Sequence, residues 1–232
     1  GMSGTPRKTA QYDLHVAAGG RMVNFAGWSM PVWFAGIAKE HETVRNAVGM
    51  FDVSHMGQLL VRGRDAAQVV DYLVTNGVSK LDGGRALYTP ALNERGTIVD
   101  DLIVYRRTDE DLLLCVNAST TTKDLRHFVS SNPGEATIEN VSDSYSQIAV
   151  QGPLAYELLG RIWPQVAESL NPFDFIEFDA DGYRVMVAGT GYTGERGYEL
   201  YVPWESGAHF WQLFARTGVD LGVAPIGLGA RD

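Results

Sequence analysis

N-E-R-G-T-I-V-D-D-L-I-V-Y, residues 93–105, is the stretch that decides the fold. Asn93 and Gly96 are typical of a tight turn, because an asparagine side chain bonds to the nearby backbone and glycine tolerates positive φ. The residues that follow, 97–105, are almost wholly β-branched or apolar, which predicts a strand. A second strand is predicted at 86–92, just before the turn. The two strands together predict an antiparallel hairpin.

Two adjacent aspartates, Asp100 and Asp101, interrupt the apolar run of this strand. Successive side chains point to opposite faces of a strand, so each carboxylate has apolar neighbours on its own face. The pattern therefore predicts a strand buried on both faces. Most such carboxylates serve structure, one accepting backbone N–H groups at a bulge and the other pairing with an arginine. If a site exists here, one of the two enters it, and the strand does not say which.

Composition bounds the class of protein. A chain of 232 residues is long enough for one large domain or two interlocked ones. Its hydrophobic content of 45% and charged content of 20% are ordinary for a soluble globular protein. The net charge of −9 argues against non-specific binding of nucleic acid. With no apolar run long enough to span a bilayer and no basic leader, we expect a soluble, cytoplasmic protein without a membrane partner.

Metal and disulfide chemistry are not expected. The one cysteine, Cys115, lies in the apolar run L-L-L-C-V and is predicted to be a buried thiol. The five histidines show no spacing of the H-x-x-x-H or H-E-x-x-H type, so no zinc site is predicted.

Hydrophobic periodicity predicts helices inserted irregularly among strands. The segment 19–31, rich in Gly, Trp and Met, is interpreted as a loop that packs large side chains against a core. Helices are predicted at 36–48 (Ile37, His41, Val44 and Val48 inward, Gly49 as C-cap), 66–74 (capped by Asp65), 123–130 (Leu125, Phe128 and Val129 inward), 153–163 and 205–217. Further strands are predicted at 51–62 with a turn at Gly57, 112–117, 136–142, 145–151, 183–188 and 198–202. This order is typical of an α+β protein with antiparallel sheets.

A glycine-rich segment, G-T-G-Y-T-G-E-R-G-Y-E at 189–199, contains the spacing G-x-G-x-x-G after a strand. A dinucleotide site needs a helix next, and here a β-rich run follows. We therefore interpret the segment as a hairpin loop that presents Tyr192 and Glu199.

Two other segments carry polar groups. Ser54 and His55 are neighbours in G-M-F-D-V-S-H-M-G, and adjacent strand residues point to opposite faces, so they do not form a nucleophile–base pair by themselves. Arg231, in G-L-G-A-R-D, either holds an anion or pairs with a carboxylate such as Asp232.

Six segments in order resemble one family. They are M-V-N-F-A-G-W-S-M-P (22–31), G-M-F-D-V-S-H-M-G (49–57), the strand with its two aspartates, A-V-Q-G-P (149–153), G-Y-T-G-E-R-G-Y-E (191–199) and G-L-G-A-R-D (227–232). Together, over residues 9–232, they resemble the glycine cleavage system T-protein family of tetrahydrofolate-dependent aminomethyltransferases. The chain departs from the family pattern in having Asn24 where Asp is usual. It also stops at Asp232, where family members continue with a helix and a third domain.

The resemblance implies a fold and a division into domains. The expected fold is α+β, with antiparallel sheets and flanking helices, the folate-binding aminomethyltransferase-like fold without its C-terminal barrel domain. The expected first domain is discontinuous, 1–50 plus 140–232, and 51–139 forms an inserted second domain. With the third domain missing from the chain, we expect an exposed apolar face, weak tetrahydrofolate binding and little activity by itself.

The resemblance also implies an activity and the residues that serve it. Such an enzyme takes the aminomethyl group from the dihydrolipoyl arm of H-protein, releases ammonia and passes the one-carbon unit to tetrahydrofolate. Its implied residues are Asp101 near folate N10 as the catalytic group, Glu199 at the pterin, Asn117, Met56 and Tyr192 lining the pocket, and Tyr88 and Arg231 toward the p-aminobenzoyl-glutamate end. No metal is implied.

Two alternatives stay open from the sequence. One is a non-catalytic folate-binding relative, which carries K-G-C-Y-x-G-Q-E where this chain has G-T-G-Y-T-G-E. The other is a folate-dependent demethylase that takes a methyl group from sulfur, because loops that the sequence does not place shape the donor site.

Overall fold

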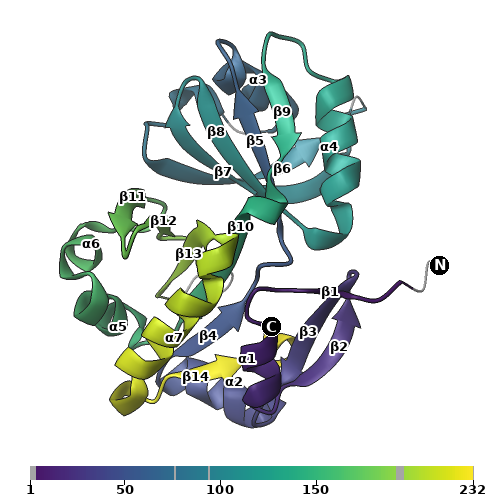
Figure 1. Ribbon diagram of the computed structural model, residues 1–232. Helices are drawn as coiled ribbons and strands as arrows, with labels where there is room; N and C mark the ends of the chain where they lie inside the picture. The colour runs from purple at the N-terminus through teal and green to yellow at the C-terminus, as the bar shows by residue number, and fades with distance from the viewer. Residues whose placement is uncertain (1–3, 76, 94, 192–195, 232) are drawn as a thin grey trace. The chain divides into compact units, whose positions relative to one another are not determined.

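The computed structural model describes residues 4–75, 77–93, 95–191 and 196–231, and the chain divides into two compact units (Figure 1). The first unit comprises residues 1–55, 145–172 and 176–232, and the second comprises 56–144 and 173–175. The two main boundaries lie five residues later than the expected ones, which follow residues 50 and 139. Each unit has its own hydrophobic cluster.

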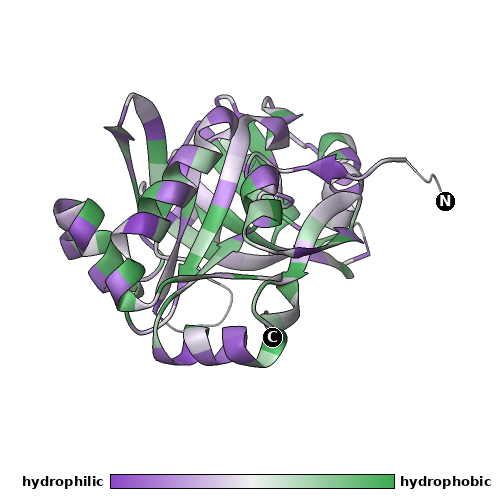
Figure 2. Ribbon diagram, turned by 60° about the horizontal axis from the view of Figure 1, so that its bottom comes forward, coloured by the Kyte–Doolittle hydropathy of each residue, from purple (hydrophilic) through white to green (hydrophobic). Residues whose placement is uncertain are grey.

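The first unit is built on a six-stranded sheet in the order β11-β12-β13-β10-β4-β14. Its strands are β4 (Gly49–Asp52), β10 (Tyr145–Gln151), β11 (Phe175–Ala180), β12 (Tyr183–Ala188), β13 (Gly197–Pro203) and β14 (Ala224–Ile226). The pairs β12–β13, β13–β10 and β10–β4 are antiparallel, whereas β14 runs parallel to β4. Helices α5 (Ala155–Ile162), α6 (Pro164–Ser169) and α7 (Gly207–Thr217) accompany this sheet. Their inward residues, among them Leu158, Phe210 and Phe214, join the cluster, and Figure 2 shows the alternating hydropathy bands of such helices.

A smaller sheet, β1-β3-β2, completes the first unit with α1 (Tyr12–Ala17) and α2 (Ile37–Asn46). The expectation of a loop at 19–31 is wrong: β2 (Arg21–Phe25) and β3 (Trp28–Trp33) form a hairpin, and β1 (Arg7–Lys8) pairs with β3. Ala26 and Gly27 form its two-residue turn with φ of 52° and 85°, the positive values that a type I′ turn requires. Alanine rarely adopts this conformation, and for that reason the turn was not visible in the sequence.

Helix α2 buries only part of the face that its hydrophobic residues predicted: Val48, just past its end, is fully buried, whereas His41 is exposed. Ile37 is 44% exposed, whereas Glu40 is 2% exposed. The Glu40 carboxylate accepts N–H groups from Phe34 (3.0 Å), Gly36 (2.8 Å) and Gly227 (2.7 Å). Three donors satisfy a buried charge that would otherwise be costly, so the carboxylate rather than the apolar stripe turns inward. The helix ends at Asn46, and Gly49 begins β4 instead of capping the helix.

The second unit is a five-stranded sheet in the order β6-β7-β8-β5-β9. Its elements are β5 (Gly57–Arg62), α3 (Ala66–Leu73), β6 (Arg85–Leu92), β7 (Ile98–Thr108), β8 (Asp111–Val116), α4 (Thr121–Ser130) and β9 (Thr137–Asn140). The predicted β6–β7 hairpin is confirmed. At its turn, Asn93 Oδ1 accepts the N–H groups of Arg95 (2.9 Å) and Thr97 (3.0 Å), and Gly96 has φ 76°. The predicted burial of Cys115 in β8 is also confirmed.

Two packing predictions for the second unit are wrong. Strand β7 is not buried on both faces: Leu102 and Val104 enter the core, but Ile98 is 60% exposed and Asp101 is exposed. The register shifts between Ile98 and Asp100 opposite β6, and such a bulge turns the start of the strand out of the core face; the side chain of Val99 lies outside the description.

Helix α4 buries Phe128 as predicted, but Val129 is 54% exposed and Asp124 is fully buried in its place. Asp65 occupies the N-cap position of α3 as predicted, but its side chain forms no capping hydrogen bond; its carboxylate accepts the N–H of Glu135 (3.1 Å) instead.

Short 3-10 turns connect these elements: η1 (Val78–Lys80), η2 (Ala118–Thr120), η3 (Ser142–Ser144), η4 (Trp204–Ser206), η5 (Val219–Leu221) and η6 (Leu228–Ala230). Over the described ranges, no helix has the length and apolar character that a membrane crossing would need.

Candidate functional site

Glu199 lies on β13 in the middle of the first unit's sheet, paired with Ala149 on β10 and Ala188 on β12. Glu199 is 8% exposed. Oε1 accepts the Thr190 hydroxyl (2.8 Å), and Oε2 accepts the amide of Gln147 (2.7 Å). Gln147 is itself held by the hydroxyl of Tyr201, 3.1 Å from the same amide nitrogen. The carboxylate is therefore fixed in orientation by neutral groups.

This arrangement suits recognition of a planar N–H edge. Each carboxylate oxygen offers two lone pairs, and Glu199 uses one on each oxygen for Thr190 and Gln147. The remaining pairs match a ligand that presents two adjacent N–H donors, such as an amino-pyrimidinone. The strands β12 and β13, on either side of residues 189–196, pair antiparallel as the predicted hairpin requires. Tyr192, which the resemblance places in the pocket, lies outside the described residues.

Asp100 on β7 is the hub of a polar cluster in the second unit. The residue is 8% exposed. Its Oδ1 accepts the backbone N–H of Asp101 (2.8 Å) and the Asn117 amide, and its Oδ2 accepts the Thr120 hydroxyl (2.7 Å). Burial raises the pKa of Asp100, but hydrogen bonds from Asp124, Thr120 and Asn117 outweigh it and hold that pKa below its usual range. Asp100 is therefore ionised, and hydrogen-bond donors stabilise its charge. This confirms the prediction that one of the two aspartates accepts a backbone N–H group.

Asp101 differs from Asp100 in its exposure and in the partners of its carboxylate. It is exposed, and within the described ranges it forms no ion pair, so the predicted arginine partner is wrong. Its N–H donates to Asp100, and Pro90, which lies opposite on β6, has no N–H to offer in return. The backbone at Asp101 is therefore held by a side chain, and the carboxylate is available to a ligand.

Two more predicted residues lie close to Asp101 in the same sheet. Tyr88 pairs with Ile103, two positions from Asp101, so Tyr88 and Asp101 share a face; Tyr88 is 48% exposed. The register that pairs Ile103 with Cys115 puts Asn117, just past the end of β8, across from Asp101. Met56, half-buried, directly precedes β5. The second unit thus holds Asp101, Tyr88, Asn117 and Met56, and the first unit holds Glu199 and Arg231.

Arg231 follows η6 and is half-buried. Its charge acts on His55, whose ring stands edge-on to Phe25 with centroids 5.4 Å apart. Burial first, and then the charge of Arg231, lowers the pKa of His55 to about 4. His55 is therefore neutral at pH 7.

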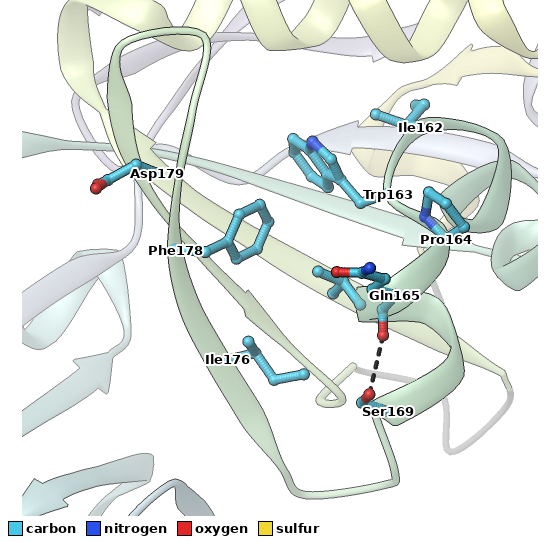
Figure 3. A pocket seen from close by; sticks show the side chains of 9 residues that line it. Ile162, Trp163, Pro164, Gln165, Ser169, Ile176, Phe178 and Asp179 are labelled. Carbon is cyan, nitrogen blue, oxygen red and sulfur yellow. Dashed lines mark hydrogen bonds between the residues drawn. The ribbon is translucent and has the colours of Figure 1, made fainter.

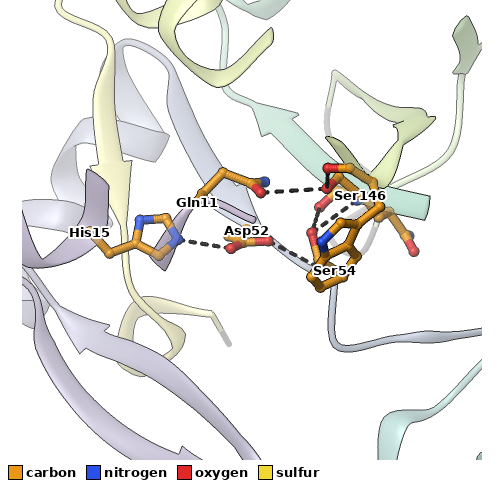
Figure 4. Close-up of polar contacts among 7 residues, drawn as sticks. Gln11, His15, Asp52, Ser54 and Ser146 are labelled. Carbon is orange, nitrogen blue, oxygen red and sulfur yellow. Dashed lines mark hydrogen bonds and ion pairs between the residues drawn. The ribbon is translucent and has the colours of Figure 1, made fainter. Parts of the chain in front are cut away.

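A second buried network in the first unit surrounds Asp52 (Figure 4). The Asp52 carboxylate accepts hydrogen bonds from His15 Nε2 (2.8 Å) and from the backbone N–H of Ser54 (3.0 Å). Burial raises the pKa of Asp52, but the hydrogen bond and charge of His15 bring it below its usual range. The Ser54 hydroxyl bonds to the main chain of Gln147. Ser54 therefore contacts neither imidazole, and no serine nucleophile with a base is formed here.

One cavity of about 570 Å³ lies beside α5, α6 and β11 (Figure 3). Trp163, Phe178 and Ile176 make it largely apolar, with Asp179 as its one ionisable residue. It contains none of the residues discussed above. In the part of the chain that the structure describes, no group of three or more His, Cys, Asp or Glu side chains is placed to hold a metal ion.

Four residues of these clusters were not identified from the sequence: Gln147, Thr190, Thr120 and Asp124. Gln147 and Thr190 come close to Glu199 only through sheet pairing, which no local pattern reveals. Thr120 and Asp124 begin α4, and a threonine followed by an acid within one turn reads as an ordinary helix start. Their contact with Asp100 depends on how η2 and the start of α4 pack on the sheet, where α4 contacts β9 and β5.

Comparisons with known proteins identify the family. A family model described as the GCVT N-terminal domain matches residues 11–232. The aminomethyltransferase of Desulforamulus reducens is 44% identical over 226 residues, which are 97% of this chain and 62% of that protein. The aminomethyltransferase of Bdellovibrio bacteriovorus is 45% identical over 227 residues, 97% of this chain and 63% of that protein. The chain thus spans under two thirds of the length of these relatives.

The comparison with solved structures also finds an aminomethyltransferase. The crystal structure of glycine cleavage system aminomethyltransferase T from Bartonella henselae matches with a TM-score of 0.86 and 30% identity, covering 97% of this chain and 61% of that one. A heterotetrameric sarcosine oxidase from Corynebacterium matches with a TM-score of 0.57 and 15% identity, which indicates a shared fold alone. Since the family model covers nearly the whole sequence, the chain belongs to the GCVT N-terminal domain family.

Proposed function

We propose that this chain carries the folate-binding and catalytic region of a tetrahydrofolate-dependent aminomethyltransferase of the glycine cleavage system. The donor is the aminomethyl group on the dihydrolipoyl arm of H-protein, and the acceptor is tetrahydrofolate. The products are ammonia, the free dihydrolipoyl thiol and 5,10-methylenetetrahydrofolate. The observation that carries the proposal is the exposed Asp101 carboxylate, at the position where the family pattern has its acid, on a backbone that Asp100 holds in place.

Asp101 is assigned the proton transfers. When the two folate nitrogens bond to the one-carbon unit, each gives up a proton; ammonia and the thiol take up one each. While it is ionised, a carboxylate near folate N10 stabilises the developing positive charge on the one-carbon unit; it then accepts the proton that a folate nitrogen gives up and passes it to a leaving group. Asp101 is suited to this role because no arginine or lysine in the described ranges neutralises it.

The other residues are assigned to binding. Glu199 accepts the N–H edge of the pterin, because Thr190 and Gln147 fix its carboxylate. Arg231 and Tyr88 are assigned to the p-aminobenzoyl-glutamate portion, whose carboxylates suit a guanidinium. Asn117, Met56 and Tyr192 are assigned to the lining of the same site. H-protein is the proposed partner and the cytoplasm the proposed location; the acidic net charge of −9 gives nucleic acid no part in this scheme.

The test compares donors. The chain, and a full-length relative as reference, are incubated with tetrahydrofolate and either aminomethyl-loaded H-protein or a methyl sulfonium compound. The proposal expects ammonia and 5,10-methylenetetrahydrofolate in equal amounts from the H-protein donor. Demethylation of the sulfonium compound without ammonia release, or saturable folate binding with no turnover by the full-length protein, would contradict it.

A further inference from the structure

Asp124, in the first turn of α4, is a buried acid that the proposed chemistry does not use. Its side chain is fully buried, and Oδ1 has no hydrogen-bond partner among the described residues. Oδ2 lies 3.1 Å from the Thr120 hydroxyl oxygen, which itself lies 2.7 Å from Asp100 Oδ2, so the two carboxyl groups interact across Thr120. A buried carboxylate oxygen without a donor is very costly if it is charged. Asp124 is therefore expected to be neutral.

The contacts decide which of the two acids carries the proton. Asp100 receives three donors: the N–H of Asp101, the amide of Asn117 and the hydroxyl of Thr120. Asp124 competes for the hydroxyl of Thr120 and has no other donor to its oxygens among the described residues. Two carboxyl groups in contact do not both ionise readily. The charge thus belongs on Asp100, and the shared proton belongs on Asp124.

The charges around Asp124 agree with this assignment. Burial first, and then Asp100 on β7, raises the pKa of Asp124 to about 8, while Lys123 on α4 lowers it only partly. The charged residues on the strands next to α4 are exposed to solvent: they are Glu139 on β9 and Arg62 on β5, which pairs with Asp111.

We infer that protonated Asp124 is a positioning residue, whose hydroxyl holds the Asp100 carboxylate in the orientation that fixes the backbone of Asp101 and the amide of Asn117. The inference about turnover rests on the proposed function; the location of the proton does not. Asp101 N–H is held by Asp100 and faces a proline on β6, so a shift of Asp100 moves Asp101 directly. Loss of the proton would place two charges in contact and disturb this arrangement.

The proton is tested first, without any activity measurement. The whole chain is labelled with ¹³C at the aspartate carboxyl carbons and titrated from pH 5 to 9. We expect one aspartate resonance that titrates near pH 8, absent in Asp124→Asn and retained in the control Asp82→Asn, an exposed acid of the same unit. If no aspartate titrates above pH 6, or if the signal persists in Asp124→Asn, the inference is wrong.

Turnover then tests the positioning role. In Asp124→Asn the carboxamide supplies the same neutral donor at every pH, so we expect turnover close to wild type at pH 7 and no decline above pH 8, where wild type declines. Asp124→Ala has no donor and should lose about tenfold in kcat, the scale of a misplaced catalytic group.

Equal losses in both variants at pH 7, or matching pH profiles of Asp124→Asn and wild type, would contradict the role. Should the alanine variant fail to fold, the asparagine profile still decides. Absence of turnover in every variant would count against the proposed function and leave the titration result intact.

Discussion

The free energy of unfolding of the second unit should depend on pH through Asp124. Its pKa in the fold is about 8, against an ordinary value of 3.8. The folded state thus keeps a proton that the unfolded state loses, so stability is fully present below pH 3.8 and is lost as the pH rises to about 8. Each pH unit within that window lowers the free energy of unfolding by about 1.4 kcal/mol. The total loss is at most about 6 kcal/mol.

Asp124→Asn removes this dependence, because a carboxamide has no proton to lose. The difference in free energy of unfolding between Asp124→Asn and wild type should shift in favour of the variant by a few kcal/mol, about half the upper bound or more, between pH 5 and pH 8. Using differences cancels the contribution of the other acids, several of which act in the opposite direction.

The chain provides a separate probe for each unit. All five tryptophans, residues 28, 33, 163, 204 and 211, lie in the first unit, whereas the one cysteine, Cys115, is buried in the second. Labelling of Cys115 at increasing urea concentrations therefore follows unfolding of the second unit, and tryptophan fluorescence follows the first. A difference between variant and wild type that stays constant with pH, or that appears equally in Asp82→Asn, would refute the reasoning.

Three further predictions concern the first unit. Glu199→Gln should weaken tetrahydrofolate binding by about tenfold to a hundredfold, the effect of losing a charge-assisted hydrogen bond. Isothermal titration calorimetry measures the affinity, with the exposed Glu205→Gln as the control. Unchanged affinity would mean that Glu199 does not bind the pterin. Glu40→Leu leaves one buried and two half-buried N–H groups without an acceptor and should destabilise the unit by about 3 kcal/mol, as measured by the tryptophan unfolding midpoint. The exposed Glu42→Leu should change the midpoint little; equal effects would mean that the Glu40 contacts contribute nothing. Gly27→Ala meets no atom within 4 Å of the added Cβ, so it should cost only the strain of a positive φ, about 1 kcal/mol, by the same measurement, and a cost near zero would argue against the type I′ turn.

Local chemistry made part of this fold predictable from the sequence. The β6–β7 hairpin follows from Asn93 and Gly96, whose turn preferences do not depend on the rest of the chain. The β2–β3 hairpin does not, because Ala26 adopts a conformation that its residue type disfavours. Helix α2 was misread because Glu40 is satisfied by Gly227, a backbone group 187 residues away.

The candidate site divides in the same way. Asp100 and Asp101 stood out as charges in an apolar strand, and the prediction of a structural carboxylate beside a second, different one is confirmed for Asp100. The role of Asp124 was invisible, since its burial comes from the docking of α4 and not from its own neighbours in sequence. Thr190 and Gln147 likewise reach Glu199 through strand pairing.

The most direct test of the account is the turnover of Asp101→Asn. The amide has the shape of the acid, so it keeps the fold and the hydrogen bond from the Asp101 N–H to Asp100, but it has neither the charge nor the ability to accept a proton. With aminomethyl-loaded H-protein and tetrahydrofolate, we predict that kcat falls by about a hundredfold or more. Folate affinity should stay within a few-fold of wild type, and Asp82→Asn should be unaffected. Turnover of Asp101→Asn within a few-fold of wild type would contradict the account.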